Sequence, residues 1–173
     1  MSQLILTAVG RDRPGLVGDV TGALFAAGAN LADSRMVNLR GQFALVILLE
    51  ASDEVLAGLR AQIPELAEKL GLSITLAGQG AAPEKSSGLA FRLKTYSMDQ
   101  PGIVHRVSDL LRKHHVNIEE LETRLESAPF MGSPIFTLEL RMHVPAQTRV
   151  PKLRKELEAV CEELNCDFDL EPA

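Results

Sequence analysis

The chain has 173 residues, of which 46 % are hydrophobic and 24 % are charged, as is usual for a globular protein. Its formal net charge is −5, divided as −2 over residues 1–87 and −3 over residues 88–173. Nucleic-acid-binding domains usually carry a basic surface, so we expect neither half to contact DNA directly. The longest purely apolar run, Phe43–Leu49, is too short for a membrane span of about 20 residues. No basic, secretion-type leader precedes an apolar run, and we therefore predict a cytoplasmic protein without membrane contact.

The first half of the sequence predicts a strand, a helix, two strands, a helix and a strand. Pro14 suits the first position of the first helix, because an N–H at that position would have no hydrogen-bond acceptor within the helix. Gly28 predicts the end of that helix, and Arg40-Gly41 predicts a tight hairpin turn. Pro64 is expected to bend or divide the second helix. The predicted strands are Leu4–Val9, Asn30–Leu39, Gln42–Glu50 and Leu72–Leu76.

Two short motifs recur at the same interval along the chain. Asp12–Val17 reads Asp-Arg-Pro-Gly-Leu-Val, and 87 residues later Asp99–Val104 reads Asp-Gln-Pro-Gly-Ile-Val. Gly28–Leu31 reads Gly-Ala-Asn-Leu, and 87 residues later His115–Ile118 reads His-Val-Asn-Ile. A pair of motifs at one fixed separation indicates that the chain contains two copies of one module.

The second half predicts the same order of elements. Its strands are expected at Leu89–Tyr96, Asn117–Glu126, Ile135–Val144 and Cys166–Leu170, and its helices at Pro101–His114 and Arg149–Leu164. We expect a first domain over residues 1–78, a linker rich in small and polar residues over 79–88, and a second domain over 89–173. The βαββαβ order predicts an α+β protein of two tandem ferredoxin-like domains, each an antiparallel sheet with two helices on one face.

This combination resembles the ACT domain. The resemblance rests on the βαββαβ order, on Asp-x-Pro-Gly-Leu/Ile-Val opening the first helix, and on Gly-Ala-Asn-Leu or His-Val-Asn-Ile opening the second strand. Two such modules and nothing else are similar to the glycine cleavage transcriptional repressor group. The resemblance implies a non-enzymatic regulator that responds to a small amino acid, with glycine suspected. Its implied protein partner is a transcriptional activator, and it implies no cofactor and allows a homo-oligomer.

The candidate ligand site is the loop that precedes the first helix of each module. Unpaired amides at a helix start suit a carboxylate, a glycine admits close approach, and an acidic side chain suits an ammonium group. In ACT domains the ligand commonly lies between this loop and a strand of a paired domain. By resemblance the ligand-binding residues are Asp12, Gly15, Asn30, Asp99, Gly102 and Asn117. Several amino-acid-binding members have asparagine at the Asp12 position, and a purely structural role for both motifs remains an alternative.

Phe130 and Met131 lie in a hairpin that has six more residues than its counterpart in the first module. These apolar side chains are predicted to contact either the neighbouring module or a partner protein. We expect no metal site, because the histidines and the cysteines Cys161 and Cys166 lack the spacing of zinc ligands. No nucleophile motif indicates a catalytic residue. The remaining alternatives are a ligand-independent interaction module and a regulatory subunit of a metabolic enzyme.

Overall fold

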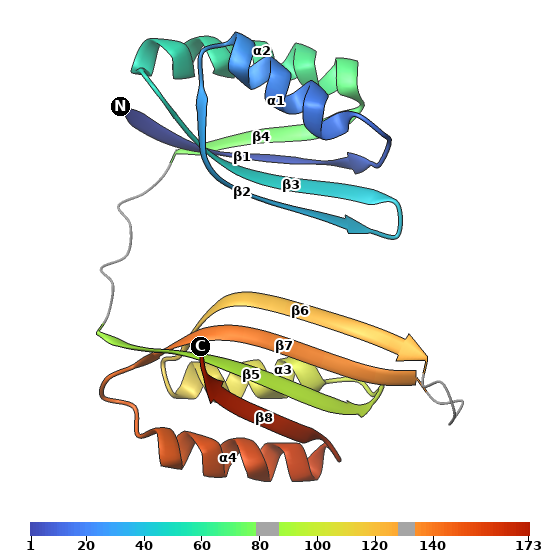
Figure 1. Cartoon of the computed structure of the whole chain (residues 1–173), viewed down its shortest axis with the longest axis vertical. Helices are drawn as coiled ribbons and strands as arrows, with labels where there is room; N and C mark the ends of the chain where they lie inside the picture. The colour runs from blue at the N-terminus through green and yellow to red at the C-terminus, as the bar shows by residue number, and fades with distance from the viewer. Residues whose placement is uncertain (79–86, 128–133) are drawn as a thin grey trace. The chain divides into compact units, whose positions relative to one another are not determined.

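The computed structural model describes residues 1–78, 87–127 and 134–173 (Figure 1). The chain divides into two compact units, which we call the N-terminal module and the C-terminal module. The N-terminal module consists of β1 (Ser2–Arg11), α1 (Leu16–Ala26), β2 (Asn30–Leu39), β3 (Gln42–Ala51), α2 (Asp53–Leu70) and β4 (Leu72–Gly78). The C-terminal module consists of β5 (Gly88–Met98), α3 (Ile103–Lys113), β6 (Asn117–Ser127), β7 (Pro134–Pro145), α4 (Val150–Glu163) and β8 (Asp167–Pro172).

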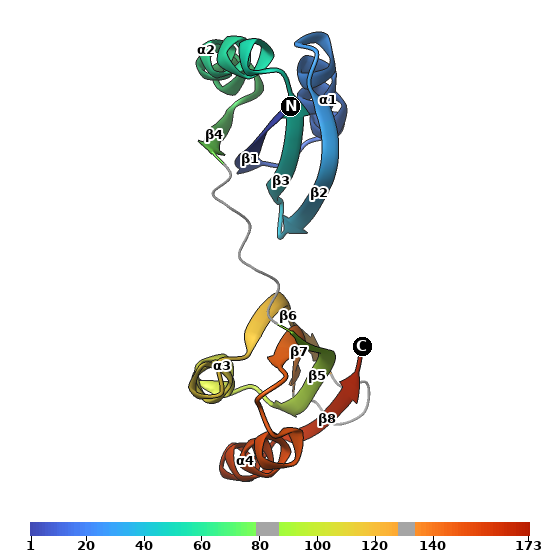
Figure 2. The same cartoon turned by 90° about the vertical axis from the view of Figure 1, so that its left-hand side faces the viewer.

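Both modules have the predicted ferredoxin-like architecture. The strand orders are β2-β3-β1-β4 and β6-β7-β5-β8, and all the ladders between neighbouring strands are antiparallel. Two helices lie on one side of each sheet (Figures 1 and 2). The α+β class and the tandem βαββαβ organisation predicted from the sequence are therefore confirmed.

Alternation along the central strands places one set of side chains beneath the helices. Leu6 and Ala8 of β1 are fully buried, whereas the intervening Thr7 is only partly buried. Phe43 and Ile47 of β3 are also fully buried on the helix side. Because successive side chains of a strand point to opposite faces, each sheet has one face in a core and one face without helices.

α1 begins two residues after the predicted position. Gly15 occupies the N-cap with φ 90°, a left-handed conformation that strongly favours glycine, so Pro14 lies in the preceding turn instead of the first helical position. The predicted helix end is confirmed, because Gly28 has φ 84° and the Ala29 N–H donates to the carbonyl of Leu24 at 3.0 Å. This arrangement is the Schellman motif, which satisfies a carbonyl in the last turn.

The hairpin between β2 and β3 turns at Arg40 and Gly41, as predicted. Both residues have positive φ, 51° and 84°, which matches the right-handed twist of the flanking strands. Pro64 lies within α2, yet the helix is continuous from Asp53 to Leu70, so Pro64 does not divide it.

Candidate functional site

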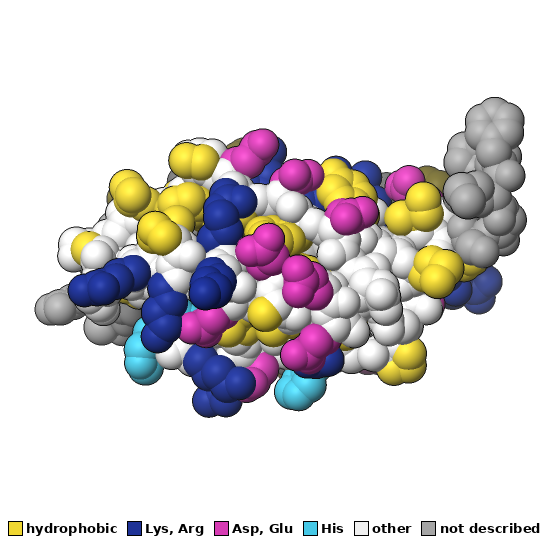
Figure 3. Space-filling model, turned by 90° about the horizontal axis from the view of Figure 1, so that it is seen from below, with side chains coloured by type: hydrophobic (Ala, Val, Ile, Leu, Met, Phe, Trp, Pro, Cys, Tyr) yellow, Lys and Arg dark blue, Asp and Glu magenta, His cyan; other side chains and the backbone are white. Residues whose placement is uncertain are grey.

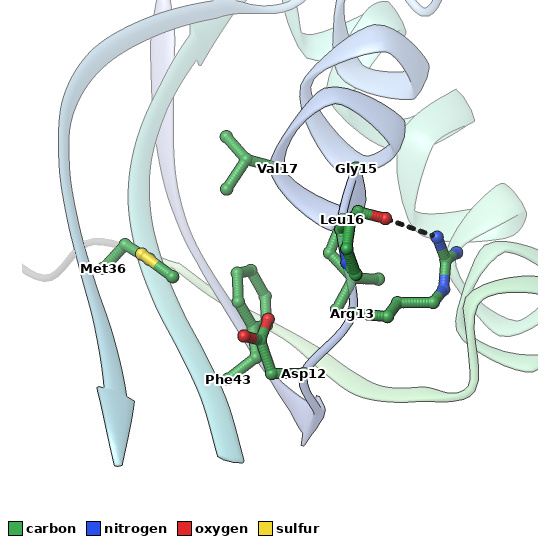
Figure 4. Close-up of a pocket in the computed structure, with 8 residues that line it drawn as sticks. Asp12, Arg13, Gly15, Leu16, Val17, Met36 and Phe43 are labelled. Carbon is green, nitrogen blue, oxygen red and sulfur yellow. Dashed lines mark hydrogen bonds between the residues drawn. The ribbon is translucent and has the colours of Figure 1, made fainter. Parts of the chain in front are cut away.

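A pocket of about 300 Å³ opens beside the start of α1 (Figure 4). The loop between β1 and α1 and the first turn of α1 form one side, and β2 and β3 supply the rest. The lining residues are Asp12, Arg13, Pro14, Gly15, Leu16, Val17, Met36 and Phe43. Phe43 is fully buried, whereas Val17 and Met36 are about half exposed, so the pocket combines an apolar base with an accessible mouth.

The first residues of α1 line this pocket, and the first turn of a helix has amides without partners inside the helix. The Asp19 N–H donates to the Gly15 carbonyl at 2.9 Å, which begins the helical hydrogen-bond ladder. Of the amides before it, the Leu16 N–H donates a long hydrogen bond to the Arg13 carbonyl at 3.5 Å, and the Val17 and Gly18 N–H groups have no carbonyl within the helix to receive them. Within the described residues, no side chain caps α1. An anion can therefore take the place of a capping side chain.

Asp12 is held by the hairpin between β2 and β3 rather than by the helix. Its N–H donates to the Gly41 carbonyl at 2.8 Å, and its Oδ2 accepts a hydrogen bond from Asn38 Nδ2 at 2.5 Å. Asn38 Oδ1 in turn accepts from the Gly41 N–H at 3.1 Å. The Asp12 side chain is partly buried, and its carboxylate is therefore fixed at the edge of the pocket.

Arg13 does not neutralise Asp12. Its guanidinium pairs with Asp19 at 2.8 Å, and both side chains are about half exposed. Arg13 also donates a longer hydrogen bond to the Pro14 carbonyl, drawn as a dashed line in Figure 4. The pocket is thus lined both by the Asp12 residue, whose carboxylate is not paired with Arg13, and by the first turn of α1.

Asn30 lies at the opposite end of β2 from this pocket. It pairs with Glu50 at the start of the strand, whereas Asn38, eight residues later, contacts Asp12. At a rise of about 3.3 Å per residue the two asparagines are roughly 26 Å apart. Within the N-terminal module, Asp12 and Gly15 are brought together, and Asn30 is not placed with them.

The corresponding loop of the C-terminal module has the same backbone but different side-chain support. Gly102 has φ 98° at the N-cap of α3, and again no described side chain caps the helix. Asp99 is exposed. The position equivalent to Asn38 is Leu125, which cannot donate a hydrogen bond to a carboxylate.

Asn117 also lies away from its loop, at the start of β6 opposite His143. It lines an open depression of about 480 Å³ together with Ser108, Arg112, His115, Val116 and Ile118. Phe130 and Met131, the predicted contact residues, lie outside the described residues.

Basic side chains of α3 are paired with acids. Arg106 pairs with Glu163, and Arg112 and Lys113 lie 2.6 and 2.9 Å from the Asp109 carboxylate. Hydrogen bonds from Arg112 and Lys113 lower the pKa of Asp109 to about 2. Figure 3 shows a face on which lysine and arginine side chains lie among aspartates and glutamates. These basic groups are consequently neutralised locally.

The cysteines are both free thiols. Cys161 is buried, which raises its pKa to about 11, and Cys166 is partly exposed. Among the described residues, no group of three or more histidine, cysteine, aspartate or glutamate side chains could hold a metal ion. In the same part of the chain, none of the helices has the length and apolar character needed to cross a membrane.

Sequence comparison places these features in a known family. The sequence profiles of the ACT domain match residues 2–77 and, separately, residues 91–162. The chain belongs to the ACT domain family.

The glycine cleavage system transcriptional repressor of Escherichia coli is 28 % identical over 162 residues, which cover 94 % of this chain and 85 % of that protein. A UPF0237 protein of Methanopyrus kandleri is 34 % identical over 76 residues, 43 % of this chain and 84 % of that protein. The crystal structure of an unknown protein from Galdieria sulphuraria superimposes with a TM-score of 0.81 and 29 % identity, covering 99 % and 98 % of the two chains. The similarity to the repressor and the two ACT domains support a regulatory role.

Proposed function

We propose that this tandem ACT-domain protein is a non-enzymatic regulator that binds a small amino acid, with glycine as the first candidate. Its proposed action is to control transcription of glycine cleavage genes by binding a transcriptional activator. The relationship to the repressor of Escherichia coli supports the regulatory role and the choice of genes. The observation that supports ligand binding is that the uncapped start of α1 and Asp12 line one pocket.

In the proposed pose the two charged ends of the amino acid contact opposite sides of the pocket. The ligand carboxylate accepts hydrogen bonds from the first-turn amides of α1, where the helix dipole favours negative charge. The ligand ammonium group lies at Asp12, whose ionised carboxylate only accepts hydrogen bonds. Asn38 uses one Asp12 oxygen, which leaves the other for the ammonium group. This pose explains how aspartate can serve where other family members have asparagine.

We assign the ligand to the N-terminal module. Its Asp12 is held by a hydrogen bond from Asn38. In the C-terminal module the position equivalent to Asn38 is Leu125, which cannot hold Asp99 in this way. A carboxylate that is already oriented loses less conformational freedom on binding, so the N-terminal loop is better prepared for a ligand.

The ligand acts by shifting a conformational equilibrium. The protein has one state that binds the activator and one that does not. The ligand can shift the equilibrium between these states by no more than the difference in its affinity for them. The regulator therefore needs no chemical step.

The test is isothermal calorimetry and thermal melting of the full chain with each of the twenty amino acids. A ligand that binds only the folded state raises the melting temperature. We expect glycine to bind, Asp12→Ala to abolish binding, and the matched variant Asp99→Ala to bind as the unchanged protein does. Circular dichroism establishes that both variants are folded.

Other outcomes identify the alternatives. If no amino acid binds at millimolar concentration, the chain is a ligand-independent interaction module. If affinity purification recovers a metabolic enzyme and no transcriptional activator, the chain is a regulatory subunit. Loss of binding in Asp99→Ala with retention in Asp12→Ala would assign the site to the other module.

A further inference from the structure

Helix α4 ends in a tight turn that leads into β8 (Figure 1), and the two cysteines of the chain lie on either side of this turn. The Cys166 N–H donates to the Cys161 carbonyl at 2.8 Å. Between them, Asn165 has φ 48° and its N–H donates to the Glu162 carbonyl at 3.1 Å. These features define a Schellman motif, in which the side chains at the positions of Cys161 and Cys166 commonly contact each other.

The same motif ends α1 and α3, where the corresponding positions are apolar. In α1 the Ala29 N–H donates to the Leu24 carbonyl at 3.0 Å. In α3 the Val116 N–H donates to the Leu111 carbonyl at 3.0 Å. All four of these side chains are buried. An apolar pair is therefore sufficient to close this turn, and the fold does not require thiols there.

The two thiols differ in accessibility. Cys161 is buried, and this burial, together with the smaller effects of the nearby Cys166 and Asp167, raises its pKa to about 11. Cys166 is partly exposed, and its Sγ donates to the Leu164 carbonyl at 3.5 Å. A small oxidant in solution can therefore reach Cys166 but not Cys161.

We propose that Cys161 and Cys166 form a covalent modification site, which closes to a reversible intramolecular disulfide when a hydroperoxide oxidises the chain. Disulfides join residues whose Cα atoms are about 4.4–6.8 Å apart. The direct backbone hydrogen bond between the two cysteines limits this separation. With standard bond lengths and angles on either side of that bond, their Cα atoms are at most about 6.7 Å apart. The disulfide therefore needs no rearrangement of the chain.

The oxidation has two steps. The Cys166 thiolate attacks one oxygen of hydrogen peroxide, the O–O bond breaks, and the leaving hydroxide takes up the thiol proton to give water and a sulfenic acid. The Cys161 sulfur then attacks the sulfenic sulfur, so that an S–S bond forms and the S–O bond breaks. The Cys161 proton leaves with the hydroxyl group as a second water. Two thiols are thus oxidised by two electrons, and one peroxide is reduced.

The turn is also bonded to the loop that precedes α3. The Leu164 carbonyl, which accepts from Cys166 Sγ, accepts a second hydrogen bond from Gln100 Nε2. A disulfide removes the S–H donor, and the bond between Leu164 and Gln100 then loses its competitor. Oxidation of the cysteines therefore alters a contact of the loop Asp99–Gly102. This inference does not depend on the proposed function.

Mass spectrometry of the full chain tests the inference. The reduced protein is exposed to hydrogen peroxide at neutral pH, blocked with iodoacetamide and digested with trypsin. Both cysteines lie in one tryptic peptide, 156–173, because no lysine or arginine follows Lys155. We expect this peptide to lose two hydrogen atoms, to carry no iodoacetamide adduct and to regain both thiols with dithiothreitol. A peptide that keeps both thiols, or a disulfide only between two chains, would overturn the inference.

Two variants separate the roles of the cysteines. In Cys161→Ala, which keeps a small apolar side chain, oxidation of Cys166 should stop at the sulfenic acid and give an adduct with dimedone. Cys166→Ala should remain unmodified, because its remaining thiol is buried. Circular dichroism shows whether each variant folds, and the mass of the unchanged protein is an independent test. Equal dimedone labelling of the unchanged protein and Cys161→Ala would contradict the second step.

NMR spectroscopy tests the connection to the loop. The side-chain amide resonances of Gln100 should shift on oxidation and return on reduction. Those of Gln3, which is hydrogen-bonded to Glu50 in the other module, are the matched control and should not shift. Gln100 resonances that stay constant while the disulfide forms would show that the loop does not respond to it.

Discussion

Thr95 offers a direct test of how the C-terminal core is packed. Its side chain is fully buried on β5, and within the described residues its Oγ1 has no hydrogen-bond partner. The equivalent residue of the N-terminal module is Ala8, so the fold does not require a hydroxyl there. Thr95→Val keeps the branched shape and removes only the polar group.

A buried polar group without a partner costs about 1–3 kcal/mol relative to its hydrated state. We therefore expect Thr95→Val to raise the free energy of unfolding of the C-terminal module by roughly that amount. For a domain of this size the melting temperature should rise by at least about 4 °C.

Urea unfolding and differential scanning calorimetry of the full chain measure both quantities. Thr7→Val is the control, because Thr7 Oγ1 lies 2.6 Å from Thr75 Oγ1 and is hydrogen-bonded to it. The control removes a satisfied hydroxyl and should not stabilise the N-terminal module. A loss of stability in Thr95→Val would refute the reasoning, since it would show that the hydroxyl is satisfied, for example by a buried water.

Three further predictions concern separate features. Gly15→Ala should lower the free energy of unfolding by about 1–2 kcal/mol through its left-handed backbone, although no atom lies within 4 Å of the new Cβ. Gly18→Ala, in the helix interior, should raise it by about 0.5–1 kcal/mol, and melting shifts of the same sign would contradict this. At pH 8, a thiol reagent followed by mass spectrometry should modify Cys166 well before Cys161, whose pKa is about 11; equal rates would contradict the burial. The Asp109 pKa is depressed to about 2, so stabilisation by its ion pairs is complete above the usual value of 3.8 and is lost as pH falls through 2. An NMR titration midpoint near 4 would contradict that pairing.

The fold was predictable because its signals are local. Arg40-Gly41 predicts a hairpin because a two-residue hairpin turn needs positive φ angles, which glycine adopts readily. The structure shows positive φ at both residues. The predicted start of α1 was two residues too early. Pro14 is suited to a first helical position, and the sequence alone does not show that Gly15 adopts a left-handed conformation and becomes the N-cap. Pro64 illustrates the converse, as packing keeps α2 continuous despite the residue that usually interrupts a helix.

The site was only partly predictable. Asp12 and Gly15 meet because they are neighbours in one loop. Asn30 does not join them, because the crossover through α1 returns the chain to the end of the sheet where β1 begins. That separation follows from the predicted topology. Asn38 was missed because its contact with Asp12 spans 26 residues and depends on the hairpin register.

The two copies agree on one side of their sheets and differ on the other. Between helices and sheet, Leu24 of α1 and Leu45 of β3 in one copy correspond to Leu111 of α3 and Leu138 of β7 in the other, all buried. On the uncovered side the equivalent of Ile5 is Arg92. The two copies therefore have the same residue type at these core positions and different side chains at this exterior position. Substitutions on the uncovered side of one sheet can consequently change which molecules that surface binds while the core residues of both modules stay the same.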